Sequence, residues 1–95
     1  MKYLRFEWDE IKNRANFKKH KISFEEAKTV FYDENARLIS DPNHSNDEDR
    51  FILLGLSHIA KILVVVHAYK EQDEVIRIIS ARKAIKNENE YYFRK

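Results

Sequence analysis

Residues 61–80 read KILVVVHAYKEQDEVIRIIS, and this stretch decides the fold. Both of its ends are rich in Val, Ile and Leu, which favour β-strands. The polar link Lys70–Asp73 between them predicts a hairpin turn, so we expect two antiparallel neighbours. A turn of three residues would place His67 and Arg77 opposite each other, whereas a turn of four would not. The sequence leaves this register open.

Two more strands are predicted ahead of this hairpin, at Ala36–Ser40 and Arg50–Leu56. The polar segment Asp41–Asp49 between them holds the only proline and is expected to be a loop. With the strands at 61–69 and 74–80 they predict a four-stranded antiparallel sheet. Residues 3–7 also alternate apolar and polar side chains and could add a short strand.

The first predicted helix begins at Asp9, which can cap it, and runs to about His20. Ile11 and Ala15 lie four residues apart, so they occupy one face of this helix. Its other faces carry Lys and Arg, and the cations gather in the last turns, where the helix dipole favours them.

The second predicted helix begins at a capping box, Ser23-Phe24-Glu25-Glu26. The Ser23 hydroxyl can accept from the backbone N–H of Glu26, and the Glu26 carboxylate can reach back to the N–H of Ser23. We expect this helix to run to about Phe31. Its buried side chains should be Phe24, Ala27, Val30 and Phe31.

A third helix is predicted from Arg82 to about Phe93, with Ser80 as its cap. The expected architecture is therefore an α+β fold with two N-terminal helices, a four-stranded antiparallel sheet and a C-terminal helix. A chain of 95 residues has room for one core, so residues 1–95 are taken as a single domain.

Composition narrows the protein class. The chain has no cysteine, which excludes a disulfide scaffold, and its longest aliphatic run, 62–66, is far shorter than the ~20 residues of a spanning helix. We expect a cytoplasmic protein that does not enter membranes. The net charge is only +2, but two basic ends flank an acidic middle, residues 23–50. Charge alone favours an ordinary solvated surface, although the two ends could fold together into one positive face.

The sequence gives little support for a metal site or for a phosphate-binding loop. The four histidines, among them His44 in the polar loop, lack the paired spacing of metal ligands. A calcium loop starting at Asp41 would need Glu where Ile52 stands, and Gly55 is the only glycine. We expect no metal and no cofactor.

What remains is a set of cations and hydrogen-bonding groups suited to RNA cleavage. RNA can be cut without metal when its own 2′-OH attacks the neighbouring phosphate, provided that a base, cations and an acid are at hand. Arginine suits the phosphate because its planar fork is always charged. Each group also has a structural reading: Arg77 could pair with an acidic neighbour, His67 could be a hydrogen-bonded core or edge residue, His20 could cap a helix, and Tyr92 could simply pack.

Two long motifs favour the RNA-cleavage interpretation over these structural interpretations. The first is Phe6-Glu7-Trp8-Asp9-x-x-Lys12-x-x-x-Asn16-x-x-Lys19-His20-x-Ile22-x-Phe24-x-x-Ala27. The second is Arg77-Ile78-Ile79-Ser80-Ala81-Arg82-Lys83-Ala84-x-Lys86-x-Glu88-x-x-x-Tyr92. They resemble the opening and closing signatures of the BrnT family of toxins, and the shorter motifs between them, 41–50 and 63–67, fall in the expected order.

The resemblance implies a RelE-like fold and an endoribonuclease that shuts down translation as the toxin of a type II toxin–antitoxin pair. It also implies neutralisation by a BrnA-type antitoxin, which binds DNA and represses the shared operon, so the toxin would meet operator DNA only through that partner. The positions that we expect to be catalytic are Arg50, His67, Arg77, Arg82 and Tyr92. Those expected to bind RNA are Lys19, His20, Lys83 and Lys86.

The chain departs from the family pattern at three positions. Lys21 stands where glycine is usual, Ile85 replaces a common Thr, and Glu90 occupies a site where a cation is common. Of these, Glu90 reduces the positive charge of the final helix. The departures leave two alternative functions open. The chain could be an inactive homologue that acts as the antitoxin's co-repressor partner, or a nucleic-acid-binding domain without catalysis.

Overall fold

The protein, seen here as a computed structural model, is described over residues 4–40, 50–72 and 74–94. The loop predicted at 41–49, with His44, lies outside these residues. The elements follow one another as β1 (Arg5–Glu7), α1 (Glu10–His20), α2 (Phe24–Lys28), a 3₁₀ turn (Thr29–Tyr32), β2 (Arg37–Ser40), β3 (Phe51–Leu56), β4 (Ile62–Lys70), β5 (Val75–Lys83) and α3 (Lys86–Phe93).

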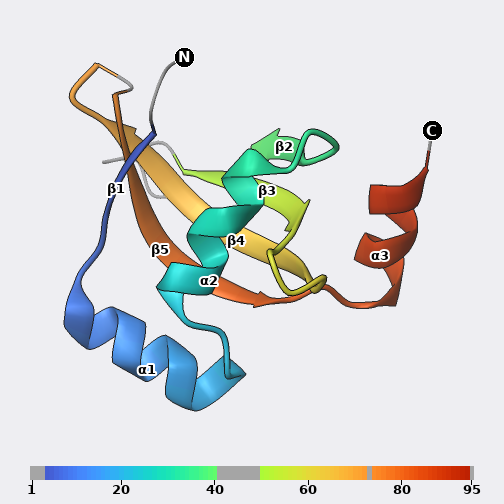
Figure 1. The fold of residues 1–95 in the computed structure, drawn as a ribbon, viewed down its shortest axis with the longest axis horizontal. Helices are drawn as coiled ribbons and strands as arrows, with labels where there is room; N and C mark the ends of the chain where they lie inside the picture. Colours follow the sequence, from blue (N-terminus) through green and yellow to red (C-terminus); the bar gives the residue numbers. More distant parts are fainter. Residues whose placement is uncertain (1–3, 41–49, 73, 95) are drawn as a thin grey trace.

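The α+β class is confirmed, but the predicted four-stranded antiparallel sheet is wrong. The sheet has five strands in the order β1-β5-β4-β3-β2 (Figure 1). β2 to β5 pair antiparallel, as expected. β1 adds a parallel edge strand beside β5, from Arg5 opposite Val75 to Glu7 opposite Arg77. A three-residue strand carries no local sign of its distant partner.

The β4–β5 hairpin contains one irregularity that decides which side chains share a face. His67 lies opposite Ile78, while its neighbour Val66 lies opposite Ser80, so Ile79 is an extra residue in β5. Lys70 lies opposite Val75, which makes a four-residue turn. His67 and Arg77 are therefore not opposite each other.

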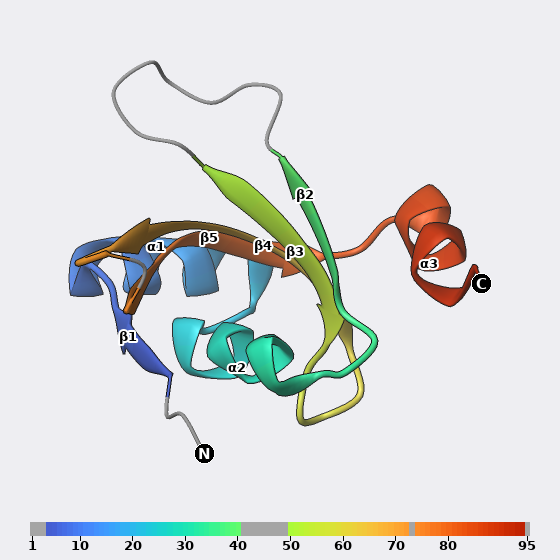
Figure 2. The same cartoon turned by 90° about the horizontal axis from the view of Figure 1, so that it is seen from above.

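The two faces of the sheet differ. α2 and the 3₁₀ turn cover one face, which we call the covered face (Figure 2). The main core lies there and consists of Ile22, Phe24, Ala27, Val30, Leu53, Leu63, Val65, Ile78 and Ala81. The opposite, open face is covered only in part by α3, where Tyr92 packs with Leu54 and Val64.

α1 lies against the edge of β5 beyond the end of β1, and it docks through polar side chains. Asn16 is buried, and its amide donates to the Ala81 carbonyl at 2.8 Å and accepts from the Ala81 N–H at 3.1 Å. The same amide nitrogen donates to the Ile22 carbonyl. Asp9 caps α1 as predicted. The apolar residues of this helix face solvent instead: Ile11 is 71% exposed, and Ala15 is exposed too.

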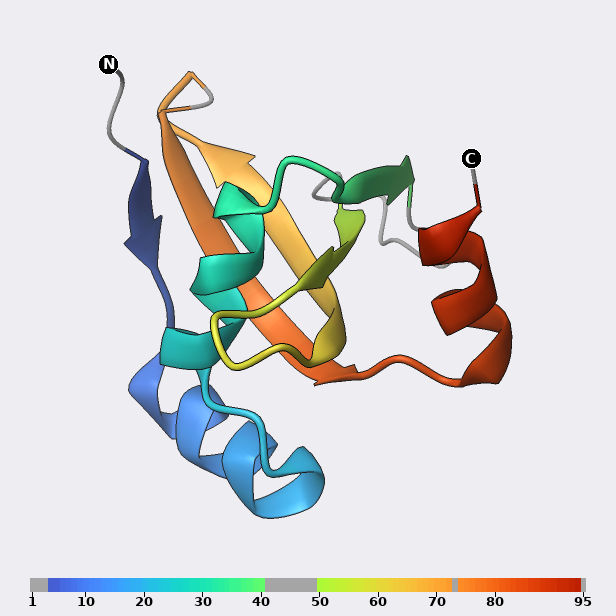
Figure 3. The same cartoon turned by 45° about the vertical axis from the view of Figure 1, so that its right-hand side comes forward.

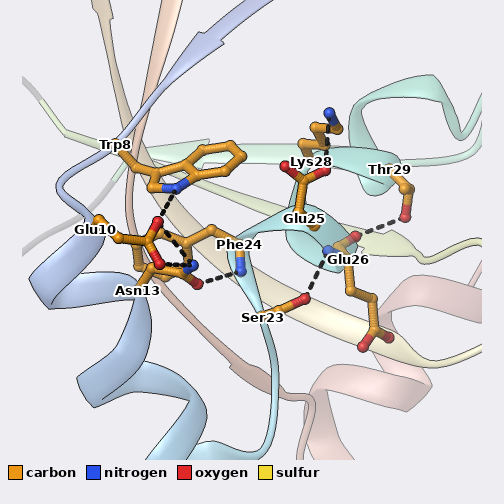
Figure 4. Close-up of polar contacts among 9 residues, drawn as sticks. All are labelled: Trp8, Glu10, Asn13, Ser23, Phe24, Glu25, Glu26, Lys28 and Thr29. Carbon is orange, nitrogen blue, oxygen red and sulfur yellow. Dashed lines mark hydrogen bonds and ion pairs between the residues drawn. The ribbon is translucent and has the colours of Figure 1, made fainter.

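The start of α2 is half as predicted (Figure 4). The Ser23 hydroxyl accepts from the Glu26 N–H at 3.0 Å, which confirms the cap. The Glu26 carboxylate does not reach back to Ser23; it accepts from the Ser57 hydroxyl at 2.8 Å. α2 is also shorter than expected, because the 3₁₀ turn takes over at Thr29, and Phe31 is only partly buried.

The predicted start of the third helix at Arg82 is wrong, and so is the Ser80 cap. β5 continues to Lys83 because Arg82 and Lys83 still pair with β4. α3 begins at Lys86, where the Glu88 carboxylate accepts from the backbone N–H of Ile85 at 2.8 Å. α3 lies to one side of the sheet, away from α1 (Figure 3).

Candidate functional site

A cleft of about 290 Å³ opens on the open face of the sheet, between the end of α1 and strands β3 to β5. Its walls hold three residues predicted to be functional, His20, Arg50 and Arg82. Its remaining lining residues are Ile52, Val64, Val66, Ser80 and Ala81. The alternation of β3 and β4 supplies an aliphatic floor, and the cations stand around it.

His20 reaches the cleft because it is the last residue of α1. The helix ends on Lys21, which adopts a left-handed conformation with φ 63° and donates its N–H to the Phe17 carbonyl at 2.8 Å. Glycine would take this conformation without strain. Lys21 thus takes over the helix-ending role that the family pattern gives to glycine, and His20 keeps its place.

Arg50 enters from the residue just before β3, on the same face as Ile52. Its Nε is buried and has no hydrogen-bond partner among the described residues. A buried N–H without a partner is unfavourable by about 1–3 kcal/mol, and more in a charged group. An anion bound in the cleft would satisfy it.

Arg82 is held by Glu88 through two parallel hydrogen bonds of 2.9 and 2.8 Å. This contact lowers the pKa of the Glu88 carboxyl and raises the pKa of Arg82. Both groups are therefore charged at neutral pH. Because Glu88 also accepts from Ile85 at the start of α3, one carboxylate joins the cleft arginine to that helix.

Arg77 lies on the open face but does not line the cleft. Its guanidinium forms an ion pair with Glu7 of β1, at 2.6 Å. The partner comes from the neighbouring parallel strand rather than from the acidic middle of the chain. This pairing fits the structural reading of Arg77.

His67 lies on the covered face, away from the cleft. It is 0% exposed, and its ring meets the Phe31 ring edge-on at 4.8 Å. Burial lowers its pKa, although the hydrogen bond to the Val65 carbonyl works in the other direction. Because a carbonyl only accepts, Nδ1 carries the proton, and Nε2 is left to accept from the Tyr69 hydroxyl. The geometry gives His67 a place in the core.

Tyr92 is also separate from the cleft. Its hydroxyl donates to Asp33 at 2.6 Å, and its ring packs in the small core under α3. Burial, together with the Asp33 hydrogen bond, raises the pKa of Tyr92 to about 12. Its proton is therefore held tightly near neutral pH.

The three lysines predicted to bind RNA lie on different parts of the molecule. Lys83 pairs with Leu63 and so belongs to the covered face. Lys86 begins α3 and is exposed. Lys19 is exposed on α1, one residue before His20 of the cleft.

Two residues were missed by the prediction from sequence: Ser80, which lines the cleft, and Glu88, which holds the cleft residue Arg82. Ser80 was taken for a helix cap, and Glu88 was given no role. The available signal was the i,i+6 pairing of an arginine with a carboxylate across a strand end, but it becomes visible only once β5 is known to reach Lys83. The described ranges contain no cluster of His, Asp or Glu that could hold a metal ion. None of the helices in those ranges is long and apolar enough to span a membrane.

Comparison with known proteins identifies the family. A family model described as "Ribonuclease toxin, BrnT, of type II toxin-antitoxin system" matches residues 8–88. A crystal structure of the Brucella abortus ribonuclease toxin BrnT superposes with a TM-score of 0.65 at 22% identity, covering 88% of this chain and 100% of that one. The search of curated proteins finds no significant match. The chain therefore belongs to the BrnT family of ribonuclease toxins of type II toxin–antitoxin systems.

Proposed function

We propose that this protein is a metal-independent endoribonuclease that cleaves RNA in the open-face cleft and thereby inhibits translation. The observation that carries the proposal is the cleft itself, where His20, Arg50 and Arg82 meet. The buried, unpartnered Nε of Arg50 is a donor in need of an acceptor, which a phosphate oxygen would supply. The RelE-like description of the fold stays a prediction.

The proposed reaction uses the RNA's own 2′-OH as nucleophile. The 2′-oxygen forms a bond to phosphorus while the bond from phosphorus to the 5′-oxygen breaks. The 2′-OH proton passes to a base and the leaving 5′-oxygen gains a proton from an acid. The products are a 2′,3′-cyclic phosphate and a 5′-hydroxyl end.

Each cleft residue has a role in this proposal. Arg50 and Arg82 stabilise the charge that grows on the phosphate oxygens. His20 moves a proton, as base or as acid, because imidazole can do both. The sequence prediction that His67 and Tyr92 are catalytic is not carried into the proposal, since both lie outside the cleft with their polar atoms engaged.

The family implies an antitoxin partner, and we propose that it is of the BrnA type. That partner would bind operator DNA, so this chain would reach DNA only as part of the complex. Placement in the cytoplasm follows from the same proposal, because messenger RNA and the operon are found there.

The test is cleavage of single-stranded RNA by the purified chain in excess EDTA. We expect the wild type to remain active and to leave 2′,3′-cyclic phosphate ends. Arg50→Ala and Arg82→Ala should each lower the rate by about 10²–10³, the usual loss when a donor to a developing anion is removed. Arg77→Ala is the matched control, since it removes the same charge from the same face outside the cleft.

Three results would contradict the proposal. They are dependence on a divalent metal, ends other than cyclic phosphate, and undiminished cleavage by the Arg50 and Arg82 variants with near-ultraviolet circular dichroism like the wild type's. Loss of cleavage in Arg77→Ala alone would restore the sequence-based site in place of the cleft.

A second candidate is supported by the ion pairs of the open face. Arg82 and Arg77 are both already neutralised, by Glu88 and Glu7. A toxin homologue whose arginines are neutralised in this way could serve as the antitoxin's co-repressor partner without cleaving RNA. Induced expression without the antitoxin would then be harmless to growth, whereas an active toxin would arrest it.

A further inference from the structure

Helix α1 turns nearly all of its side chains outward. Only Asn16 is buried. Four cations lie in the helix, and a fifth is the residue that caps its C-terminal end: Lys12, Arg14, Lys18, Lys19 and Lys21. Glu10 is the only acidic residue in the helix. A helix that is held through asparagine amides and carries this excess of positive charge leaves a charged surface free to bind a partner.

The contacts of α1 fix its rotation about its own axis. Asn16 points to the backbone of β5, and Asn13 accepts from the N–H of Phe24 at the start of α2. Glu10 accepts from the Trp8 indole and from Asn13, so the flank with Glu10 lies on the covered side, beside α2 (Figure 4).

The 100° turn per residue then assigns the cations to separate sides. Lys12 and Lys19 fall on the flank opposite Glu10, which is the flank toward the open face of the sheet. Arg14 and Lys18 fall on the side away from the sheet. Lys12 and Lys19 therefore lie on the same side of the molecule as the cleft, which begins at the next residue, His20.

The spacing of this pair suits a nucleic-acid strand. Seven residues of helix span about 10 Å, and a stacked strand rises by about 3.4 Å per nucleotide, so the pair covers about three nucleotides. Both lysines are exposed, and neither has an ion-pair partner within the described residues. The large apolar side chains of α1, Ile11 and Phe17, lie on its other sides, so this flank offers charge without an apolar anchor for a protein.

We propose that the Lys12–Lys19 flank of α1 is a backbone track along which single-stranded RNA extends beyond the cleft. Lys19 contacts the phosphate next to the cleft, and Lys12 contacts one about three nucleotides away. This proposal rests on the proposed ribonuclease function, and it adds Lys12 to the residues that bind the substrate.

The test compares Lys12→Ala with Lys18→Ala, which removes the same charge from the same helix on the side away from the sheet. The probe is a 12-nucleotide RNA with 2′-O-methyl groups throughout, which cannot attack its own phosphates. We expect Lys12→Ala to weaken binding by about 3- to 10-fold at low salt and to reduce the salt slope by about 0.7, the value for one lost phosphate contact. Lys18→Ala should leave both quantities unchanged.

The outcomes separate this proposal from the one that it rests on. Equal losses in both variants, or none in Lys12→Ala, would overturn the track while wild-type cleavage still supported the ribonuclease. No cleavage and no binding by the wild type would overturn both. If Lys12→Ala bound RNA normally but lost capture of the co-expressed antitoxin, the flank would be a protein interface instead.

Discussion

The hydroxyl of Tyr92 joins two distant parts of the chain through a single hydrogen bond to Asp33. Asp33 also accepts from the N–H of Leu56 and of Asn35, so its carboxylate is the centre of a small network. Burial disfavours its charge, but the hydrogen bonds from Tyr92, Leu56 and Asn35 together lower the pKa of Asp33. The hydrogen bond thus favours the ionised carboxylate of Asp33 and the protonated hydroxyl of Tyr92.

We predict that Tyr92→Phe lowers the free energy of unfolding at pH 7 by about 2 kcal/mol, the usual contribution of a hydrogen bond to a charged group. The folded-state pKa of about 12 exceeds the ordinary tyrosine value of 10.0. The unfolded chain therefore releases this proton first, and the stabilisation is lost between pH 10 and 12. Urea unfolding of both proteins across that range should show the two stabilities converging.

Tyr91→Phe is the control for this measurement. Tyr91 is exposed, and its ring stacks under the guanidinium of Arg37, a contact that Phe keeps. The free energy of unfolding of the Tyr91→Phe variant should match that of the wild type at every pH. A constant difference between Tyr92→Phe and the wild type from pH 8 to 12 would show that the hydroxyl does not titrate as described.

At the scale of elements, α1 shows how a helix can be held without an apolar face. Its inward face is made of asparagines, and Asn16 bonds to Ala81 as a neighbouring strand would. A pattern search for Ile and Ala at i,i+4 spacing selects the wrong face, because it assumes that docking is hydrophobic.

We predict that Asn16→Ala destabilises the protein by about 3 kcal/mol, because it leaves three buried backbone groups of Ala81 and Ile22 without their partner. Ile11→Ala, which removes a larger and more hydrophobic side chain, should change stability by less than about 0.5 kcal/mol. Urea midpoints at constant slope measure both. The reverse order of effects would mean that Ile11 and Ala15 are the docking face after all.

The starts of α1 and α2 were predictable because a cap is a local signal, and Asp9 and Ser23 both cap as expected. The start of α3 was not. Arg82 and Lys83 suit a helix by composition, but pairing with β4 keeps them in the strand. The parallel partner of β1 is likewise a property of the folded sheet, since Arg5 and Val75 meet across 70 residues.

For the whole molecule, β4 is the most enclosed element, with β3 and β5 as neighbours and α2 over one face. α3 is attached more lightly, through the packing and hydrogen bond of Tyr92, the contacts of Arg37 and the Arg82–Glu88 pair. We predict that β4 amides exchange hydrogen only on global unfolding, whereas α3 amides exchange at least about 100-fold faster through local opening. Mass spectrometry of exchanged peptides tests this, and equal protection of both elements would contradict it.

The candidate site also needed the whole molecule. His20, Arg50 and Arg82 come from three separate segments that the sequence could nominate but not bring together. His67 was nominated on equal grounds, and only the sheet assigns it to the other face. Residue type predicts the chemistry that is possible, and topology decides which of the candidates meet.

The extra residue in β5 has a consequence for chain length. Arg77 and Arg82 are an odd number of positions apart, so a regular strand would send them to opposite faces, yet they share the open face because Ile79 is additional. A regular strand that kept Ile79 would preserve every charge but turn Ser80 and Arg82 into the core. Between these two arginines the number of residues and the irregularity are linked, because a strand one residue shorter would be regular and would still keep both arginines on the open face. We therefore expect relatives to keep or lose the extra residue and the irregularity together.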